Sequence, residues 1–242
     1  FEHYCKTSIP YTYKASAVVF PSTTEEVQKV ASIANEYKIP LWPCSNGKNW
    51  GYGSASAVLE GSIILVLSRM DKILEVNEEL AYVTIEPGIS YKKLNDFLKK
   101  KEIKLWVDCT DGPPQGSVIG NALERGVGET PYGDHFANLC GMEIVLANGE
   151  VINTGGGLGE KSKTWNTYKW GTGPYLEGIF SQGNFGIVTK ATVWLMPEPE
   201  SFCSFTFDIA DAHYLKKVVD KIRKLSLQNS IRTKVHLIND FV

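Results

Sequence analysis

The stretch LWPCSNGKNWGYGS, residues 41–54, follows a short apolar segment and concentrates glycine, asparagine and serine. Glycine lets the backbone approach a ligand closely and adopt φ values that other residues avoid. Successive backbone N–H groups in such a loop form a concave nest that binds anions, so phosphate or pyrophosphate is the expected guest. An ordinary surface loop is the simpler interpretation of a Gly/Asn-rich stretch. Trp42, Trp50 and Tyr52 are costly to place on a solvent-facing turn, and they favour a ligand cradle.

The loop does not match the two common nucleotide-binding patterns. The Walker pattern requires Gly-Lys followed by Ser or Thr, whereas Lys48 is followed by Asn49. The dinucleotide pattern G-x-G-x-x-G also fails, because Gly51 and Gly53 are followed by Ser, Ala and Ser. Both of these nucleotide-binding folds therefore lose support.

The bulk composition is that of an ordinary globular chain. Its 242 residues can bury a sizeable core in one large domain or two small ones. The formal net charge of −2 provides no basic field for nucleic acid, and the longest apolar run, at residues 63–67, is too short to span a membrane. Five widely spaced cysteines and scattered histidines predict neither a disulfide framework nor a metal site. The chain starts at Phe1 rather than Met, so we interpret it as a fragment or a processed chain.

The predicted elements begin with a strand–helix–strand–loop module. Residues 15–20 and 39–42 are typical of strands, and a capping segment at residues 22–26 starts a helix with apolar residues at helical spacing. The remaining elements include a hairpin around Ala-Asn-Gly at residues 147–149. Further strands are predicted at residues 62–67, 73–76, 81–85, 105–107, 143–146, 150–153 and 187–195, and helices at residues 91–98 and 117–124.

Pro197 and Pro199 mark a domain boundary. Beyond them the pattern predicts a strand at residues 202–209, a helix at residues 212–225 and the start of a strand at residues 235–238. We therefore expect residues 1–199 to form one domain and residues 200–242 to begin a second, incomplete one.

Five sequence blocks, from about residue 15 to the end of the chain, resemble one family. They are NWGYG at residues 49–53, EPG at 86–88, GNALERGVG at 120–128, TPYGDH at 130–135 and GNFGIVT at 183–189. Together they resemble the vanillyl-alcohol oxidase/p-cresol methylhydroxylase flavoproteins. The resemblance implies an α+β chain: a PCMH-type FAD-binding domain of two α/β subdomains, followed by the truncated start of an α+β cap domain. The GYG and PYGDH blocks indicate the branch that oxidises 4-alkylphenols.

The resemblance also implies that FAD lies between the two halves of the first domain, on small and neutral residues. Small residues permit close backbone approach, and Ser and Asn can hydrogen-bond phosphate without repelling it. The implied FAD contacts are Ser45, Asn46, Gly47, Lys48 and Asn49 at the pyrophosphate, Gly51 and Tyr52 toward the isoalloxazine, Pro87 and Gly88 on the adenine side, Ser117, Asn121 and Gly128 in the central groove, and Gly186, Ile187 and Val188 at the adenine–ribose end.

Two residues are the catalytic candidates. In relatives, the tyrosine that matches Tyr52 hydrogen-bonds the phenolic oxygen of the substrate and favours phenolate; a core aromatic residue is the alternative interpretation. Phenolate pushes electron density toward the benzylic carbon as hydride leaves for flavin N5. Asp111 is our choice for the aspartate that some relatives place near N5, while Asp108 is expected to cap a turn.

Other chemically suggestive residues receive structural interpretations. Asp134 and His135 follow a Pro-Tyr-Gly turn, and adjacent residues seldom point into the same site. His3 matches only loosely a histidine that assists covalent flavin attachment in some relatives. The aromatic residues between Trp165 and Tyr175 are expected to anchor a long loop, or to line the substrate entrance or a subunit contact.

The predicted activity is FAD-dependent oxidation of a 4-alkylphenol or 4-hydroxybenzylic alcohol. A 2-hydroxy acid dehydrogenase of the D-lactate or glycolate type on the same fold is one alternative, and a non-catalytic flavin-binding module is another. The expected partners are a phenolic substrate, a cytochrome c-type electron acceptor or oxygen, and further copies of the full-length protein in a homo-oligomer. Neither nucleic acid nor a membrane is an expected partner, and a soluble, cytoplasmic location is favoured over a periplasmic one.

Overall fold

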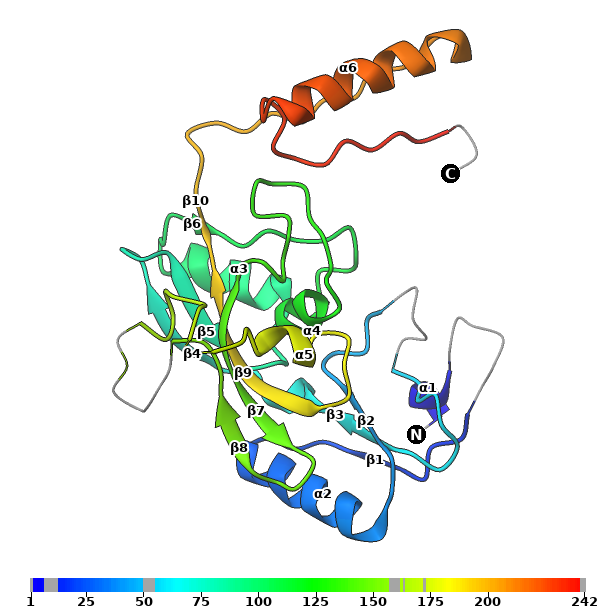
Figure 1. Cartoon of the computed structure of the whole chain (residues 1–242), viewed down its shortest axis with the longest axis vertical. Helices are drawn as coiled ribbons and strands as arrows, with labels where there is room; N and C mark the ends of the chain where they lie inside the picture. The colour runs from blue at the N-terminus through cyan, green and yellow to red at the C-terminus, as the bar shows by residue number, and fades with distance from the viewer. Residues whose placement is uncertain are drawn as a thin grey trace.

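The computed structural model describes residues 2–6, 13–49, 55–156, 162, 164–171 and 173–239 (Figure 1). Its first part contains the predicted strand–helix–strand module, built around a small parallel sheet with strand order β1-β3-β2. The elements of this part are α1 (Glu2–Cys5), β1 (Ala17–Val19), α2 (Thr24–Tyr37), β2 (Leu41–Cys44), β3 (Ile63–Val66) and η1 (Leu67–Arg69). The strand and helix predictions for residues 15–67 are confirmed.

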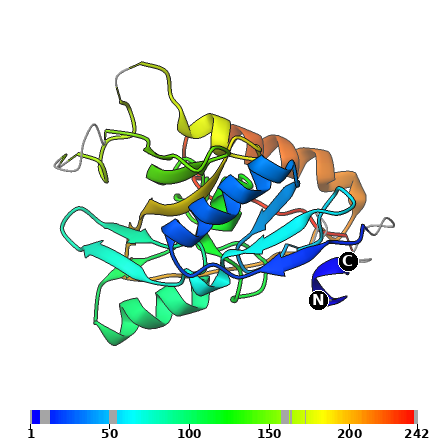
Figure 2. The ribbon, with the colours of Figure 1, turned by 90° about the horizontal axis from the view of Figure 1, so that it is seen from below.

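Helix α2 joins the small sheet to the larger one. Its N-cap is Thr23, whose hydroxyl accepts a hydrogen bond from the Glu26 N–H at 3.3 Å. The helix lies across the two sheets when the molecule is viewed from below (Figure 2). Its buried face joins an apolar cluster drawn from both sheets: Val27, Ala31, Leu65, Leu67, Met70, Val145 and Ile187. Burial of this face, rather than helix propensity, is what stabilises α2 in place.

The larger sheet is antiparallel and has the strand order β4-β5-β9-β7-β8. Its strands are β4 (Ile73–Asn77), β5 (Tyr82–Ile85), β7 (Leu139–Leu146), β8 (Val151–Asn153) and β9 (Gly186–Trp194). The predicted hairpin is confirmed, with Gly149 at its turn at φ 86°. Strand β7 begins at Leu139, earlier than predicted, because Leu139 to Met142 also pair with β9 and are buried there.

The main hydrophobic core lies between this sheet and the short helices that follow β5. Helices α3 (Tyr91–Lys100) and α4 (Val118–Leu123) confirm the predictions, whereas α5 (Glu177–Phe180) was not predicted. Ser90 caps α3, where its hydroxyl accepts from the Lys93 N–H at 3.1 Å. The fully buried members of this core include Ile85, Ile89, Leu94, Ile119, Leu139, Met142 and Ile144.

The last part of the chain leaves the main body through a short strand pair. Strands β6 (Leu105–Trp106) and β10 (Met196–Pro197) are antiparallel, and η2 (Ala212–Tyr214) and α6 (Leu215–Leu227) follow, with α6 at one end of the molecule (Figure 1). The predicted helix is confirmed, but the predictions of strands at residues 202–209 and 235–238 are wrong. The side chains of both segments are mostly exposed. In the described chain no neighbouring strand supplies the hydrogen-bond partners that the backbone N–H and C=O groups of a strand need.

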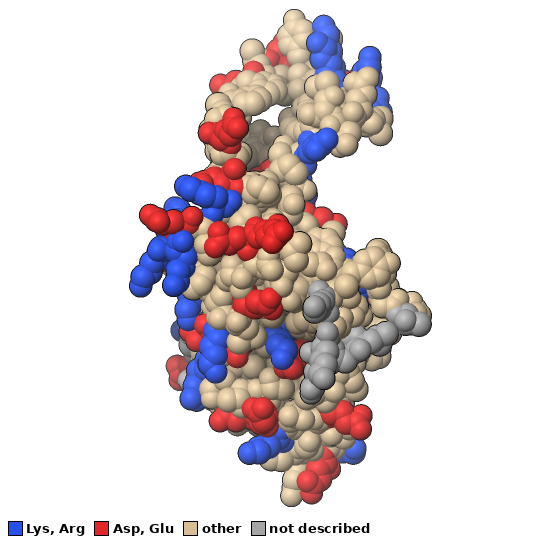
Figure 3. All heavy atoms as spheres, turned by 90° about the vertical axis from the view of Figure 1, so that its left-hand side faces the viewer, with Lys and Arg blue, Asp and Glu red and all other residues tan. Residues whose placement is uncertain are grey.

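The surface of the molecule carries charges of both signs. Figure 3 shows Lys and Arg interspersed with Asp and Glu on one face, rather than gathered by sign. Among the described residues, no helix is long and apolar enough to cross a membrane.

Candidate functional site

The loop after β2 meets two other segments through a single side chain. The Asn46 amide Nδ2 donates to the carbonyl oxygens of Gly88, at 3.3 Å, and Gln115, at 3.1 Å. The Ser45 hydroxyl lies directly against Gly120 of α4, where an added Cβ would overlap it. Three of the predicted cofactor segments, around residues 45–49, 87–88 and 117–121, therefore come together at Ser45 and Asn46.

Ser117 fixes α4 to the turn at residues 87–88. Its hydroxyl donates to the Pro87 carbonyl oxygen at 2.6 Å and accepts from the Gly120 N–H at 2.9 Å, so it is also the N-cap of α4. The side chain is buried, and Ser90 and Ser117 pair as an isolated bridge. Ser117 thus fixes α4 relative to the turn at residues 87–88, and its hydroxyl is already hydrogen-bonded within the protein.

A Ser117→Ala variant is expected to lower the free energy of unfolding by about 1–3 kcal/mol, because it removes a helix cap and leaves a buried carbonyl oxygen without its donor. Urea denaturation would measure the loss. The matched control is Ser226→Ala, at an exposed position of α6, which should change stability by less than about 0.5 kcal/mol. Equal stability of the two variants would contradict the role assigned to Ser117.

The loop after β2 combines a glycine in the left-handed conformation with an exposed lysine. Gly47 has φ 61°, and an added Cβ would lie 2.9 Å from the Ala55 Cβ. Lys48 is exposed, and within the described part of the chain it has no carboxylate partner. A glycine-lined loop beside an unpaired ammonium group is suited to a phosphate group. Gly51 and Tyr52, predicted to lie toward the isoalloxazine, are outside the described residues.

The predicted contacts in β9 have packing roles in the structure. Ile187 and Val188 are buried on opposite faces of the sheet, Ile187 against α2 and Val188 in the main core. Gly186 pairs with Leu146, and a Cβ there would overlap a methyl group of Ile144. All three residues pack within the sheet, and a direct contact of any of them with the cofactor stays a prediction.

The structure distinguishes the two aspartates of the loop before α4. Asp108 is buried, and its Oδ1 lies 2.8 Å from Nε2 of His135. The predicted catalytic residue, Asp111, is exposed and lies beside Glu129 and His236, with the ligand atoms of all three within 4.8 Å of one another. Its proposed proximity to the flavin stays a prediction.

His135 and Asp134 point apart, as the turn interpretation predicted. The Asp134 carboxylate accepts from the Ala137 N–H at 2.9 Å at the surface, while the His135 imidazole is buried. His135 contacts Asn121 and Tyr91 as well as Asp108. Sequence reasoning missed this buried cluster, because its members are far apart in the chain and only the folded loop brings them together.

Asp108 makes stability depend on pH. Burial alone would raise the pKa of Asp108, but hydrogen bonds from His135 and Thr130 outweigh it and hold the pKa below its usual value of 3.8. A carboxyl group whose pKa is lower in the folded state than in the unfolded state stabilises the fold at pH values above its unfolded-state pKa. This stabilisation is lost as the pH falls through its folded-state pKa.

The unmodified chain should therefore have a higher free energy of unfolding than an Asp108→Asn variant, and this difference should shrink as pH falls from about 5 to about 2.5. Denaturant unfolding at several pH values measures this gap. Asp96→Asn, which breaks an exposed pair with Lys92, is the control and should show a smaller change with pH. A gap that stays constant over this range would contradict the depressed pKa.

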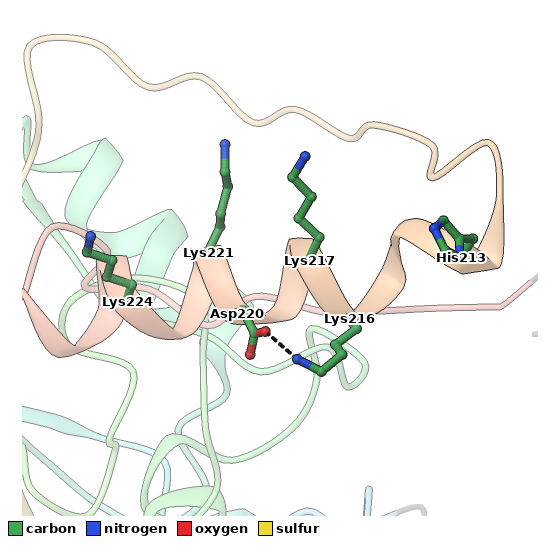
Figure 4. A pocket seen from close by; sticks show the side chains of 6 residues that line it. All are labelled: His213, Lys216, Lys217, Asp220, Lys221 and Lys224. Carbon is green, nitrogen blue, oxygen red and sulfur yellow. Dashed lines mark hydrogen bonds and ion pairs between the residues drawn. The ribbon is translucent and has the colours of Figure 1, made fainter.

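Two further features lie away from these loops. The ring centroids of Trp170 and Tyr175 lie 5.1 Å apart. Trp165 donates its Nε1–H to the Thr154 carbonyl oxygen at 2.8 Å. A pocket beside α6 is lined by Lys216, Lys217, Asp220, Lys221, Lys224 and His213 (Figure 4). None of the predicted site residues lines this pocket.

The comparisons with known proteins define the class of the chain. Residues 15–155 match the FAD binding domain family, and the chain belongs to that family. The cofactor is FAD. The residues present fit it, because the loop after β2 has Gly47 at φ 61° and the exposed Lys48 offers a cation for a pyrophosphate.

Within this class, the resemblance to the vanillyl-alcohol oxidase/p-cresol methylhydroxylase flavoproteins is confirmed. The chain is 43% identical over 220 residues to the 4-cresol dehydrogenase [hydroxylating] flavoprotein subunit of Pseudomonas putida, covering 91% of this chain and 42% of that protein. It is 42% identical over 230 residues to the 1'-carboxy-chondrochloren decarboxylase of Chondromyces crocatus, covering 95% and 42%. A crystal structure of p-cresol methylhydroxylase with substrate bound superposes with a TM-score of 0.92 at 41% identity, covering 96% of this chain and 46% of that one. The chain thus spans less than half the length of these relatives.

Proposed function

We propose that this chain is the FAD-binding part of an oxidoreductase that takes a hydride from the benzylic carbon of a 4-alkylphenol or a 4-hydroxybenzyl alcohol. The observation that carries the proposal is the convergence of three glycine-containing segments at Ser45 and Asn46, in a chain that is 43% identical over 220 residues to a 4-cresol dehydrogenase flavoprotein subunit. FAD, when bound, supplies the hydride acceptor N5.

The residues of the chain have separate tasks in this proposal. The backbone N–H groups of residues 45–49 bind the pyrophosphate, and Lys48 adds a positive charge. Tyr52 donates a hydrogen bond to the phenolic oxygen of the substrate and favours phenolate, and Asp111 accepts a proton near the reacting carbon. Residues 1–199 form the FAD-binding domain and residues 200–242 begin the domain that covers the substrate. The electron acceptor is a cytochrome c-type protein or oxygen, and the full-length protein is a homo-oligomer.

A visible absorption spectrum of the purified chain, reconstituted with FAD and then precipitated with acid, tests the cofactor assignment. We expect flavin bands that move with the chain on gel filtration and appear in the supernatant after precipitation, which indicates non-covalent binding. Bands that remain in the pellet would instead indicate a covalent link within these residues. Failure to bind FAD after reconstitution would overturn the proposal for this chain.

Substrate assays on the full-length protein separate the proposed reaction from its alternatives. Under anaerobic conditions, a 4-alkylphenol is expected to bleach the flavin, whereas its O-methyl ether, which cannot form phenolate, should not. Bleaching by a D-2-hydroxy acid alone would favour the dehydrogenase alternative. The similarity to a decarboxylase supports one further candidate reaction, and release of CO₂ from a carboxylated alkylphenol would identify it. Oxygen consumption and cytochrome c reduction then distinguish the two electron acceptors.

A further inference from the structure

Residues 126–135 form a closed hairpin at the edge of the proposed FAD groove. The Gly128 N–H donates to the Gly133 carbonyl oxygen at 2.9 Å, and Val127 pairs with Asp134 as an isolated bridge. A tight turn closes its tip, where the Gly133 N–H donates to the Thr130 carbonyl oxygen at 2.9 Å. The hairpin contains Gly128, one of the predicted groove residues, so its position matters to the groove.

The inner side of the hairpin is held by both carboxylate oxygens of Asp108. Oδ2 accepts from the Thr130 N–H at 2.8 Å, and Oδ1 lies 2.8 Å from Nε2 of His135. The side chains of His135 and Asp108 are only 7% and 3% exposed. Hydrogen bonds to a charged group in such a site are stronger than those between neutral groups, and the loss of one partner is costly.

The other nitrogen of the imidazole connects the hairpin to two helices. Nδ1 of His135 lies 2.5 Å from Oδ1 of Asn121, in α4, and 3.3 Å from the hydroxyl of Tyr91, in α3. Burial raises the pKa of Tyr91, so its hydroxyl keeps its proton. His135 therefore joins the hairpin, the loop before α4 and both helices.

The glycines of the hairpin lie directly on these side chains. A Cβ at Gly126 would overlap the amide of Asn121, and a Cβ at Gly128 would overlap Oδ1 of Asp108. The backbone can approach this closely because glycine has no Cβ, and both of the side chains that it approaches contact His135. These contacts tie the path of the hairpin to a buried polar network.

We propose that Asp108 and His135 are positioning residues of the FAD site, which fix the 126–135 hairpin and the Asn121 amide and so set the affinity of the chain for FAD. The proposal rests on the proposed function, in which Asn121 and Gly128 belong to the FAD groove. Both residues act through the hairpin and through α4, and neither has to touch the cofactor.

The outer side of the hairpin offers a matched control. Nε2 of His236 lies 2.8 Å from Oε1 of Glu129, but both side chains are about half exposed, at 47% and 44%. An exposed pair of this kind contributes little to stability. A His236→Ala variant therefore removes a histidine contact from the same hairpin while leaving the inner network intact.

The test is a titration of FAD, with fluorescence quenching as the measure of binding. It is carried out on the unmodified chain and on the variants His135→Ala, His135→Gln, Asp108→Asn and His236→Ala. Urea denaturation establishes that each variant is folded at the titration temperature. In a fully folded variant, a change of Kd reports the geometry of the site and not global stability. We expect Kd to rise at least about tenfold for His135→Ala and Asp108→Asn and to stay within about twofold for His236→Ala.

The conservative variant separates positioning from simple packing. Gln at position 135 keeps an N–H that can reach Asp108, and we expect it to recover the affinity to within about threefold of the unmodified chain. If His135→Ala does not fold, the Kd values of Asp108→Asn and His135→Gln decide the question. A Kd raised in Asp108→Asn but not in His135→Gln supports the proposal, and an unchanged Kd in Asp108→Asn overturns it. Unchanged affinity in folded His135→Ala and Asp108→Asn would overturn the proposal. Failure of the unmodified chain to bind FAD would instead overturn the proposed function.

Discussion

Replacing Gly128 by alanine is expected to disrupt the 126–135 hairpin and abolish tight FAD binding. An added Cβ would overlap Oδ1 of Asp108 and lie 2.7 Å from the carbonyl oxygen of Cys109. The Asp108 carboxylate cannot move away without losing its contacts with the Thr130 N–H and with His135. The carbonyl oxygen of Cys109 belongs to the backbone, so no side-chain rotation can move it. Relief of the clash must therefore break the buried network or displace the hairpin. The expected cost is about 3 kcal/mol or more of unfolding free energy.

Denaturant unfolding and FAD titration of the Gly128→Ala variant provide the two measurements. Gly178→Ala is the matched control, because a Cβ at Gly178 meets only ring atoms of Tyr175, the nearest at 3.7 Å. Gly178 lies within α5, where alanine is the better helix former, so this variant should be as stable as the unmodified chain or slightly more stable. If Gly128→Ala matched the control in both measurements, the hairpin would not depend on contact with Asp108.

The local parts of the fold could be predicted from the sequence. Thr23 and the apolar spacing after it define α2, and Ala-Asn-Gly at residues 147–149 defines the β7–β8 hairpin, because caps and turns depend on a few adjacent residues. The glycines at 47 and 88 were predicted to let the backbone approach FAD, which stays a prediction; in the structure both lie closely against other parts of the protein.

The parts that depend on distant partners could not be predicted in the same way. Asp108 and His135 are 27 positions apart, and only the folded hairpin turns one toward the other. The segment at residues 202–209, with Phe205, Phe207 and Ile209 at every second position, resembles a strand, yet a strand requires a neighbour with free backbone groups. Side-chain alternation alone cannot show whether that neighbour exists.

A second substitution, Gly88→Ala, tests the other side of the proposed FAD groove. An added Cβ would lie 2.7 Å from the carbonyl oxygens of both Met70 and Ser68, and 2.9 Å from that of Leu67. All three obstacles are backbone atoms in or next to η1, so no side-chain rotation relieves them. Because Pro87 and Gly88 also accept hydrogen bonds from Ser117 and Asn46, a displaced turn would loosen the junction of the three loops.

We expect the Gly88→Ala variant to lose about 3 kcal/mol of unfolding free energy and to bind FAD at least about tenfold more weakly. Gly112→Ala is the control, since a Cβ there meets only the Thr110 methyl group, at 3.3 Å. The two effects are separable, because a variant that is still folded in the titration buffer reports the geometry of the groove through its Kd. A folded Gly88→Ala variant with unchanged FAD affinity would show that the turn at residues 87–88 supports the fold without forming part of the site. Loss of affinity in a folded variant would assign the turn to the groove.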